Sequence, residues 1–147
     1  MSGEVNGIAH IQLNVINIEN CLPFWERFCY FLELKTLMKS DDMVYCKGSR
    51  TGLLVRQAPE GKRDQAFDQD RPGLHHICFC ARNNEDVDAI HDFVRDKLGG
   101  KTVRPPEEGP WVPGYYSILF EDPDGLHVEV NFVPGKGHLK DERAKGK

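Results

Sequence analysis

The chain has 147 residues, of which 39% are hydrophobic and 29% charged, and its formal net charge at pH 7 is −4. This length suits one domain, and the composition excludes collagen, a coiled coil and a wholly disordered chain. No apolar run approaches the roughly 18 residues of a membrane-spanning helix. An acidic chain also suits nucleic-acid phosphates poorly, so we expect neither a membrane nor a nucleic acid as partner.

The first half of the chain, residues 6–58, begins with an amphipathic strand. Residues 8–15 alternate strictly between apolar and polar side chains, which predicts a strand with one face of each kind. Asn17 is a typical helix N-cap, and we expect a helix over 18–31. Three short strands should follow, at 34–38, 43–46 and 52–57.

A polar linker, residues 59–72, precedes a second half at 73–134 in which the same pattern restarts. A strand is expected at 74–81 and a helix at 85–98, which Gly99 and Gly100 should end. Three further strands are predicted, at 101–104, 115–121 and 127–132. The segment Asp122-Pro123-Asp124-Gly125 is a strong turn signal between the last two strands.

The two halves therefore repeat one order of elements: strand, helix and three strands. Each half should make a curved sheet with one helix behind it, and neither closes a cavity alone. Two such halves, from one chain or from two, can face each other across a pocket.

Three further features of the sequence bear on where the protein resides. Residues 135–147 carry five Lys or Arg and two Asp or Glu, which predicts a basic, flexible tail. The first residues lack the charged and apolar segments of a secretory signal. The five cysteines are odd in number, which favours free thiols in a reducing compartment. We therefore expect a cytoplasmic protein.

Titratable side chains share the polar faces of three predicted strands. His10 lies on the first strand, the repeat puts His76 in the same phase, and Glu129 lies on one face of the last strand. Two imidazoles and a carboxylate are the ligand set of an open catalytic metal site. The set fits the facial triad of iron(II), and Mn, Co, Ni and Zn are also compatible.

The same residues have alternatives. A single strand histidine more often forms a hydrogen-bonded pocket wall than a metal ligand. His75 competes with His76, and only the repeat separates them. His127 is in phase with Glu129, so it is either a further ligand or a group that supports one.

Three segments resemble the vicinal oxygen chelate superfamily, which includes glyoxalase I, bleomycin-resistance proteins, extradiol dioxygenases, fosfomycin thiol transferases and methylmalonyl-CoA epimerase. They are residues 8–15, 74–79 and 120–129, the last reading Phe-Glu-Asp-Pro-Asp-Gly-Leu-His-Val-Glu. The resemblance implies an α+β fold of paired βαββ modules, forming curved mixed sheets around a cavity in a homodimer. It also implies that His10, His76 and Glu129 bind one divalent metal ion (Fe, Mn, Zn, Ni or Co).

The chain departs from each subfamily at a defined position. When Gly52 is aligned with Gly125, the fourth metal ligand of glyoxalase I-like members falls on Arg56, which stays protonated. The tyrosine that dioxygenases and thiol transferases tend to place ten residues before the last ligand would be Leu119. The resemblance therefore assigns the superfamily and leaves the subfamily open.

The function expected from the resemblance is that of a metal-dependent lyase or isomerase that chelates a small oxygenated substrate. Glu129 would be both a ligand and the catalytic residue. An extradiol-type dioxygenase or a thiol transferase would use the same triad, and a metal-free protein that sequesters a small molecule is the alternative of another class. The expected substrate contacts are Arg56, Gln12, Asn14, Ser117, Asn131, Tyr115 and Trp111.

Overall fold

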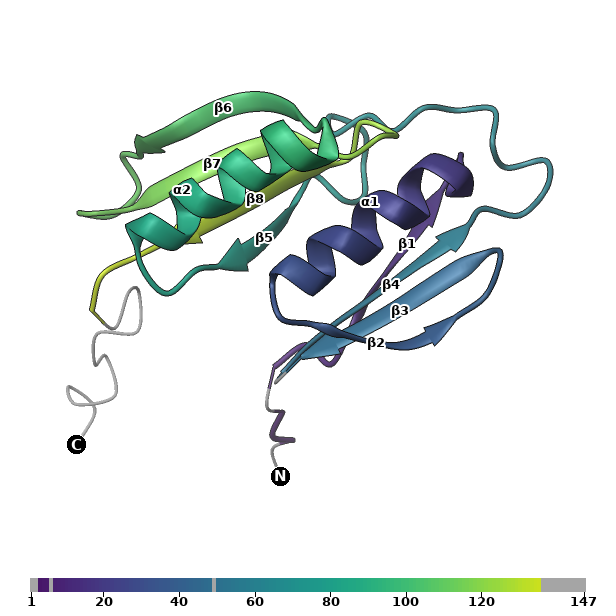
Figure 1. Cartoon of the computed structure of the whole chain (residues 1–147), viewed down its shortest axis with the longest axis horizontal. Helices are drawn as coiled ribbons and strands as arrows, with labels where there is room; N and C mark the ends of the chain where they lie inside the picture. Colours follow the sequence, from purple (N-terminus) through teal and green to yellow (C-terminus); the bar gives the residue numbers. More distant parts are fainter. Residues whose placement is uncertain (1–2, 6, 49, 136–147) are drawn as a thin grey trace. The chain divides into compact units, whose positions relative to one another are not determined.

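The computed structural model describes residues 3–5, 7–48 and 50–135. Except for Gly135, the predicted basic tail therefore lies outside the described residues. The chain forms two compact units. Unit 1 comprises Met1–Asp68 with Asp122–Leu126, and unit 2 comprises Gln69–Glu121 with His127–Lys147. Each unit is built on one four-stranded sheet with a helix against it (Figure 1).

Unit 1 contains the first predicted set of elements. In chain order these are β1 (Ile11–Val15), α1 (Ile18–Phe31), β2 (Lys35–Lys39), β3 (Met43–Gly48) and β4 (Thr51–Gln57). The strand order is β1-β4-β3-β2, with β1 parallel to β4 and the other pairs antiparallel. As expected, the side chain of Asn17 caps α1 by accepting from the Asn20 N–H. Trp25 and Phe28 are fully buried under this helix.

Unit 2 contains the second set. Its elements are β5 (Ile77–Cys80), α2 (Asn84–Phe93), a π-helical turn η1 (Val94–Leu98), β6 (Lys101–Glu108), β7 (Tyr116–Glu121) and β8 (His127–Phe132). The strand order β5-β8-β7-β6 and the directions of pairing repeat those of unit 1. The predicted α+β class and the repeat of two modules with mixed sheets are therefore confirmed. In the described part of the chain, no helix is long and apolar enough to cross a membrane.

The two parallel edge strands are shorter than the sequence predicts. Strand β1 starts at Ile11 and β5 at Ile77, so His10 and His76 each lie directly before a strand. In unit 2 the reason is the partner strand, because Ile77 pairs with Val128 and β8 begins only one residue earlier. Before the start of β8, the residues that precede β5 have no partner strand with which to form ladder hydrogen bonds.

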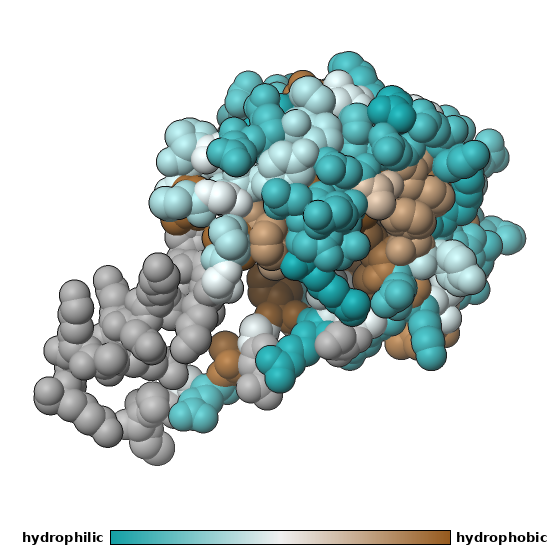
Figure 2. Space-filling model, turned by 60° about the vertical axis from the view of Figure 1, so that its left-hand side comes forward, coloured by the Kyte–Doolittle hydropathy of each residue, from teal (hydrophilic) through white to brown (hydrophobic). Residues whose placement is uncertain are grey.

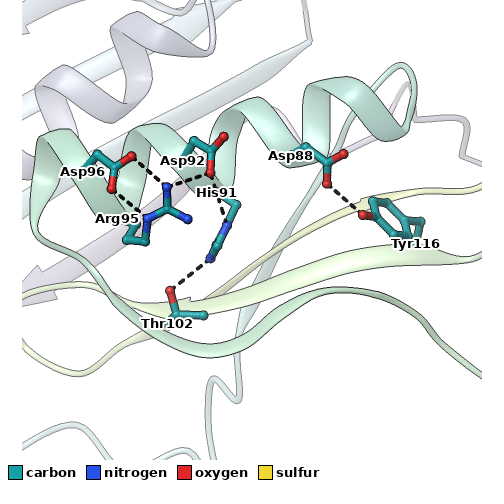
Figure 3. Close-up of polar contacts among 7 residues, drawn as sticks. All are labelled: Asp88, His91, Asp92, Arg95, Asp96, Thr102 and Tyr116. Carbon is teal, nitrogen blue, oxygen red and sulfur yellow. Dashed lines mark hydrogen bonds and ion pairs between the residues drawn. The ribbon is translucent and has the colours of Figure 1, made fainter.

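Polar side chains tie α2 to the sheet of unit 2 (Figure 3). His91 Nε2 lies 3.2 Å from Thr102 Oγ1 on β6, and the Tyr116 hydroxyl donates a 2.7 Å hydrogen bond to Asp88. The hydrogen bond to Asp88 raises the pKa of Tyr116 to about 12. Thr102 and Tyr116 therefore mark the side of the sheet that α2 covers, and alternate residues of each strand point to the other side.

The hydrophobic core of unit 2 lies on the α2 side of its sheet. Ile118 and Phe120 of β7 and Val128 and Val130 of β8 are almost fully buried there. Other large hydrophobic side chains stay exposed, and Figure 2 shows brown patches of such residues among hydrophilic ones. The other side of the unit 2 sheet, which carries the intervening residues, is the face with the polar groups described next.

Candidate functional site

Glu129 is the buried acid at the centre of the polar face of unit 2. It lies in the middle of β8, where it pairs with Cys78 of β5 on one side and Leu119 of β7 on the other. Only 7% of its surface is exposed. A carboxylate that is removed from water to this extent needs partners.

The two oxygens of the Glu129 carboxylate have different partners. His76 Nε2 lies 3.1 Å from Oε2. The Tyr115 hydroxyl donates a 2.6 Å hydrogen bond to Oε1, and Arg104 Nη2 lies 3.5 Å from the same oxygen. One oxygen is therefore held by a phenol and a guanidinium, and the other faces an imidazole.

Arg104 reaches this face because β6 contains a bulge. Thr102 pairs with Phe120 on the α2 side, but the register shifts before Arg104, which pairs with Leu119 on the opposite side. Its Nη2 donates a 2.8 Å hydrogen bond to Ser117 Oγ, so the predicted contact residue Ser117 lies at this site. Arg104 was missed by the sequence analysis because strict alternation places it beside Thr102 under the helix.

The loop before β7 brings Trp111 and Tyr115 to the same cluster. The Gly109 N–H donates to the Tyr115 carbonyl (2.8 Å), and the Tyr115 N–H donates to the Val112 carbonyl (3.0 Å). The rings of Trp111 and Tyr115 lie 4.9 Å apart, and the Arg104 guanidinium lies 5.6 Å from the centroid of the Trp111 ring. The backbone of this loop therefore holds both predicted aromatic residues beside Arg104.

Burial and the hydrogen bond to Glu129 raise the pKa of Tyr115 to about 12. The phenol therefore stays protonated at neutral pH and remains a donor to the carboxylate. Asn131, the next residue of β8 on the same face, pairs with Ser117 across the strands. Three of the predicted contact residues, Tyr115, Ser117 and Asn131, thus share one face with Glu129.

Two further histidines lie beside His76. His75 Nδ1 is 2.8 Å from His76 Nδ1, and the rings of His75 and His127 lie 6.5 Å apart, edge to face. His127 Nε2 is 3.4 Å from Glu121 Oε1. The structure thus pairs His76 with Glu129 and His127 with Glu121, while His75 contacts the nitrogen of His76 that points away from Glu129.

The donor atoms of His76 and Glu129 fit a shared divalent cation. Bonds of about 2.0–2.2 Å place neighbouring ligand atoms about 2.8–3.1 Å apart around an octahedral ion and about 3.3–3.6 Å apart around a tetrahedral one. The two atoms are 3.1 Å apart, which matches the octahedral spacing. Metal-binding carboxylates and imidazoles also usually have a hydrogen-bonded partner on their other atom. Tyr115 and His75 occupy those positions here.

Two donors do not complete a metal site. Within the described ranges, no group of three or more His, Cys, Asp or Glu side chains is arranged to hold a metal ion. The predicted third ligand, His10, belongs to unit 1, whereas His76 and Glu129 belong to unit 2. The three-residue metal site therefore stays a prediction.

The remaining predicted residues lie on the corresponding face of unit 1. His10 is exposed, and its ring meets that of Tyr45 edge to face at 6.2 Å. Gln12 Nε2 donates to Asn14 Oδ1 over 3.3 Å. Arg56 Nε lies 3.6 Å from Asp42 Oδ2, and just over half of each side chain is exposed.

The strand register corrects the alignment between the two halves. Ile11 pairs with Leu53 in unit 1, as Ile77 pairs with Val128 in unit 2, so the counterpart of Glu129 is Leu54. The bulge in β2 agrees, because it places Met38 opposite Tyr45 as the bulge in β6 places Arg104 opposite Leu119. Arg56 is thus the counterpart of Asn131, and the apolar Leu54 occupies the position expected for a fourth ligand.

Comparisons with known proteins agree with this architecture. Residues 7–130 match the model of the Glyoxalase/Bleomycin resistance protein/Dioxygenase superfamily. The Bacillus subtilis (strain 168) protein YqjT is 30% identical over 123 residues, which cover 82% of this chain and 94% of YqjT.

Solved structures share the fold at lower identity. One from Bacillus halodurans is 24% identical with a TM-score of 0.78, over 87% of this chain and 96% of its own. Lactoylglutathione lyase from Agrobacterium tumefaciens is 22% identical with a TM-score of 0.64, over 88% and 96%. The chain belongs to the glyoxalase, bleomycin resistance protein and dioxygenase superfamily.

Proposed function

We propose that the protein is a metal-dependent enzyme that holds one divalent cation with His76, Glu129 and His10 and chelates a small oxygenated substrate, with a lyase or isomerase reaction. The observation that carries the proposal is the 3.1 Å separation of His76 Nε2 and Glu129 Oε2. The other oxygen of Glu129 is already held by Tyr115 and Arg104. This arrangement leaves one imidazole nitrogen and one carboxylate oxygen side by side.

A cation bound at this pair would act as a Lewis acid that polarises the oxygens of the substrate. The residues of the chain supply orientation. Tyr115 and Arg104 fix the Glu129 carboxylate, and His75 fixes the ring of His76 through its Nδ1. Glu129 would also accept a proton from the substrate during the reaction.

The other contacts would come from both modules. Asn131 and Ser117 share the face of Glu129, and we include Gln12, Asn14 and Arg56 of unit 1 as substrate contacts. His10 would reach the cation either within one chain or across a homodimer, in which the first module of one copy faces the second module of the other.

The metal content of the purified protein tests this proposal. Protein prepared without chelator, or reloaded with Fe, Mn, Zn, Ni or Co, should contain about one ion per chain by elemental analysis. Glu129→Ala, His76→Ala and His10→Ala should each weaken binding about 100-fold or more. His91→Ala is the matched control, because His91 lies on the α2 side of the sheet beside Thr102. No metal in any wild-type preparation would overturn the proposal.

The second candidate is a metal-free protein that sequesters a small molecule. The observation in its favour is Arg104, whose guanidinium balances the charge of Glu129 without a cation. Binding of small molecules by protein that takes up no metal would support this function. If metal does bind, oxygen uptake with catechols tests the dioxygenase alternative, and a methylglyoxal–glutathione hemithioacetal assay tests the lyase.

A further inference from the structure

We propose that Arg104, stacked beside Trp111, is the anchor for a single carboxylate group of the substrate. The inference rests on the proposed function for the position of the substrate, and it deepens that function by naming the class of substrate. This class is small monocarboxylates with a second oxygen next to the carboxylate, such as 2-oxo and 2-hydroxy acids. It rests on the contacts, the unused donors and the charge balance of Arg104.

The contacts of Arg104 hold the guanidinium in one place. The β6 bulge aims the side chain at the polar face, Ser117 accepts a 2.8 Å hydrogen bond from Nη2, and the Trp111 ring lies 5.6 Å away. About a quarter of the side chain is exposed. The group is therefore placed before any ligand arrives, which reduces the entropy lost on binding.

The protein does not use all the donors of this guanidinium. Arginine has five N–H donors in a planar fork. Among the described residues, the buried Nε of Arg104 has no hydrogen-bond partner, and its ion-pair partner Glu107 lies 3.5 Å away. A buried donor without a hydrogen bond is costly, and a carboxylate matches the fork geometry.

The charge balance favours a monoanion. Arg104 lies near two carboxylates, those of Glu129 and Glu107. With a divalent cation on Glu129, the positive groups would exceed these carboxylates by one formal charge. One carboxylate would neutralise that excess, whereas a phosphate dianion would leave one negative charge uncompensated.

The other module lacks this anchor. Met38 occupies the counterpart of Arg104, at the same bulge in β2, and Leu54 occupies the counterpart of Glu129. The repeat thus has a charged pair in unit 2 where unit 1 has two apolar side chains. Arg104→Met installs the side chain that the fold accepts at the equivalent bulge, which makes it the natural test variant.

The experiment compares pyruvate with pyruvamide, its uncharged amide, on the full-length protein with and without added metal. Binding is followed by chemical-shift changes at the Trp111 indole N–H. Wild type should bind pyruvate at least about 10-fold more tightly than pyruvamide. Arg104→Met should lower the affinity for pyruvate about 10- to 100-fold more than it lowers the affinity for pyruvamide, because only pyruvate loses a charged partner. Arg104→Lys keeps the charge and loses the planar fork of donors, so its affinity for pyruvate should lie between those of the wild type and Arg104→Met.

Arg95→Met is the matched control, because Arg95 pairs with Asp92 and Asp96 on the helix surface (Figure 3). It should change neither affinity. Equal binding of the two probes by wild type, or an equal loss of both in a folded Arg104→Met, would overturn the anchor. Protein that prefers pyruvate but takes up no metal would overturn the metal site and keep the anchor, so the two proposals fail separately.

Discussion

The indole N–H of Trp25 donates a 3.0 Å hydrogen bond to Asp122 Oδ2, and both side chains are buried. The other oxygen of Asp122 accepts from the backbone N–H groups of Asp124 and Leu126. The turn after β7 is therefore bonded to α1, in unit 1. Strand β8, which carries Glu129, begins at the residue that follows this turn.

Asp122→Ala should lower the free energy of unfolding by about 3 kcal/mol, because it leaves the buried Trp25 N–H and two backbone donors without their acceptor. Denaturant titration measures the loss. Asp122→Asn keeps an acceptor and should retain much of the stability, while Asp41→Ala, at an exposed position, should be close to neutral. Equal losses for Asp122→Ala and Asp41→Ala would contradict this role of the turn.

The stability of the wild type relative to Asp122→Asn should fall with rising pH. Burial raises the pKa of Asp122 above its ordinary value of 3.8. A group with a raised folded pKa stabilises the fold fully below the unfolded pKa and loses this contribution as the pH rises through the folded pKa. Unfolding measured from pH 4 upward checks the sign, because Asn does not titrate. A difference that is constant with pH would show that folding does not shift the pKa of Asp122, and would contradict the prediction.

Tyr115→Phe should loosen the Glu129 carboxylate, because it removes the 2.6 Å hydrogen bond to Oε1. We expect a loss of about 1 kcal/mol in stability and about 10-fold weaker metal binding in a competition with chelator. Tyr116→Phe is the matched control, since its hydroxyl bonds to Asp88 on α2. This variant should lose similar stability and no metal affinity. Identical metal affinities for both variants would argue against support of Glu129 by Tyr115.

Gly109→Ala should displace the Trp111 ring. A Cβ at Gly109 would clash with Trp111 Cζ3, so the ring could not stay in place. Because 59% of Trp111 is exposed, the ring can turn away into solvent, and acrylamide quenching of Trp111 fluorescence should increase. Gly3→Ala, where a Cβ meets nothing within 4 Å, is the control. Unchanged quenching in Gly109→Ala would contradict the packing of this loop.

Cys78 should react slowly with iodoacetamide although the residue is exposed. Burial of the sulfur among protein atoms is the largest cause of a raised pKa for this thiol, and the negative charge of the neighbouring Glu129 carboxylate is the second. Together they raise the pKa of the Cys78 thiol to about 12. Roughly one thiol in ten thousand is then ionised at pH 8. Glu129→Gln should speed alkylation severalfold, as measured by mass spectrometry of the Cys78 peptide, and Glu107→Gln should not. A rate that Glu129→Gln leaves unchanged would contradict this electrostatic coupling.

The periodic segments were predictable because their signal is local. Alternation at 8–15 and the cap at Asn17 indicate a strand and a helix from neighbouring residues alone. The phase of β8 was predictable in the same way, since Val128 and Val130 had to face the core if Glu129 did not. The repeat then indicated the fold, because the same order of elements returns in both halves.

Pairing between distant strands decided what local patterns left open. A bulge adds one residue against a partner strand, so no count along β6 alone shows that Arg104 leaves the side of Thr102 and joins Glu129. Register likewise assigned Leu54, and not Arg56, as the counterpart of Glu129, since it depends on which residues face each other across β1 and β4.

The amino-acid sequence by itself thus determined the elements, their faces and the family resemblance, because periodicity, caps and turns act over a few residues. Only the tertiary structure decided that Tyr115 and Arg104 hold one oxygen of Glu129 and His76 faces the other. These four side chains come from separate segments, and hydrogen bonds between sheet neighbours, rather than spacing along the chain, bring them together.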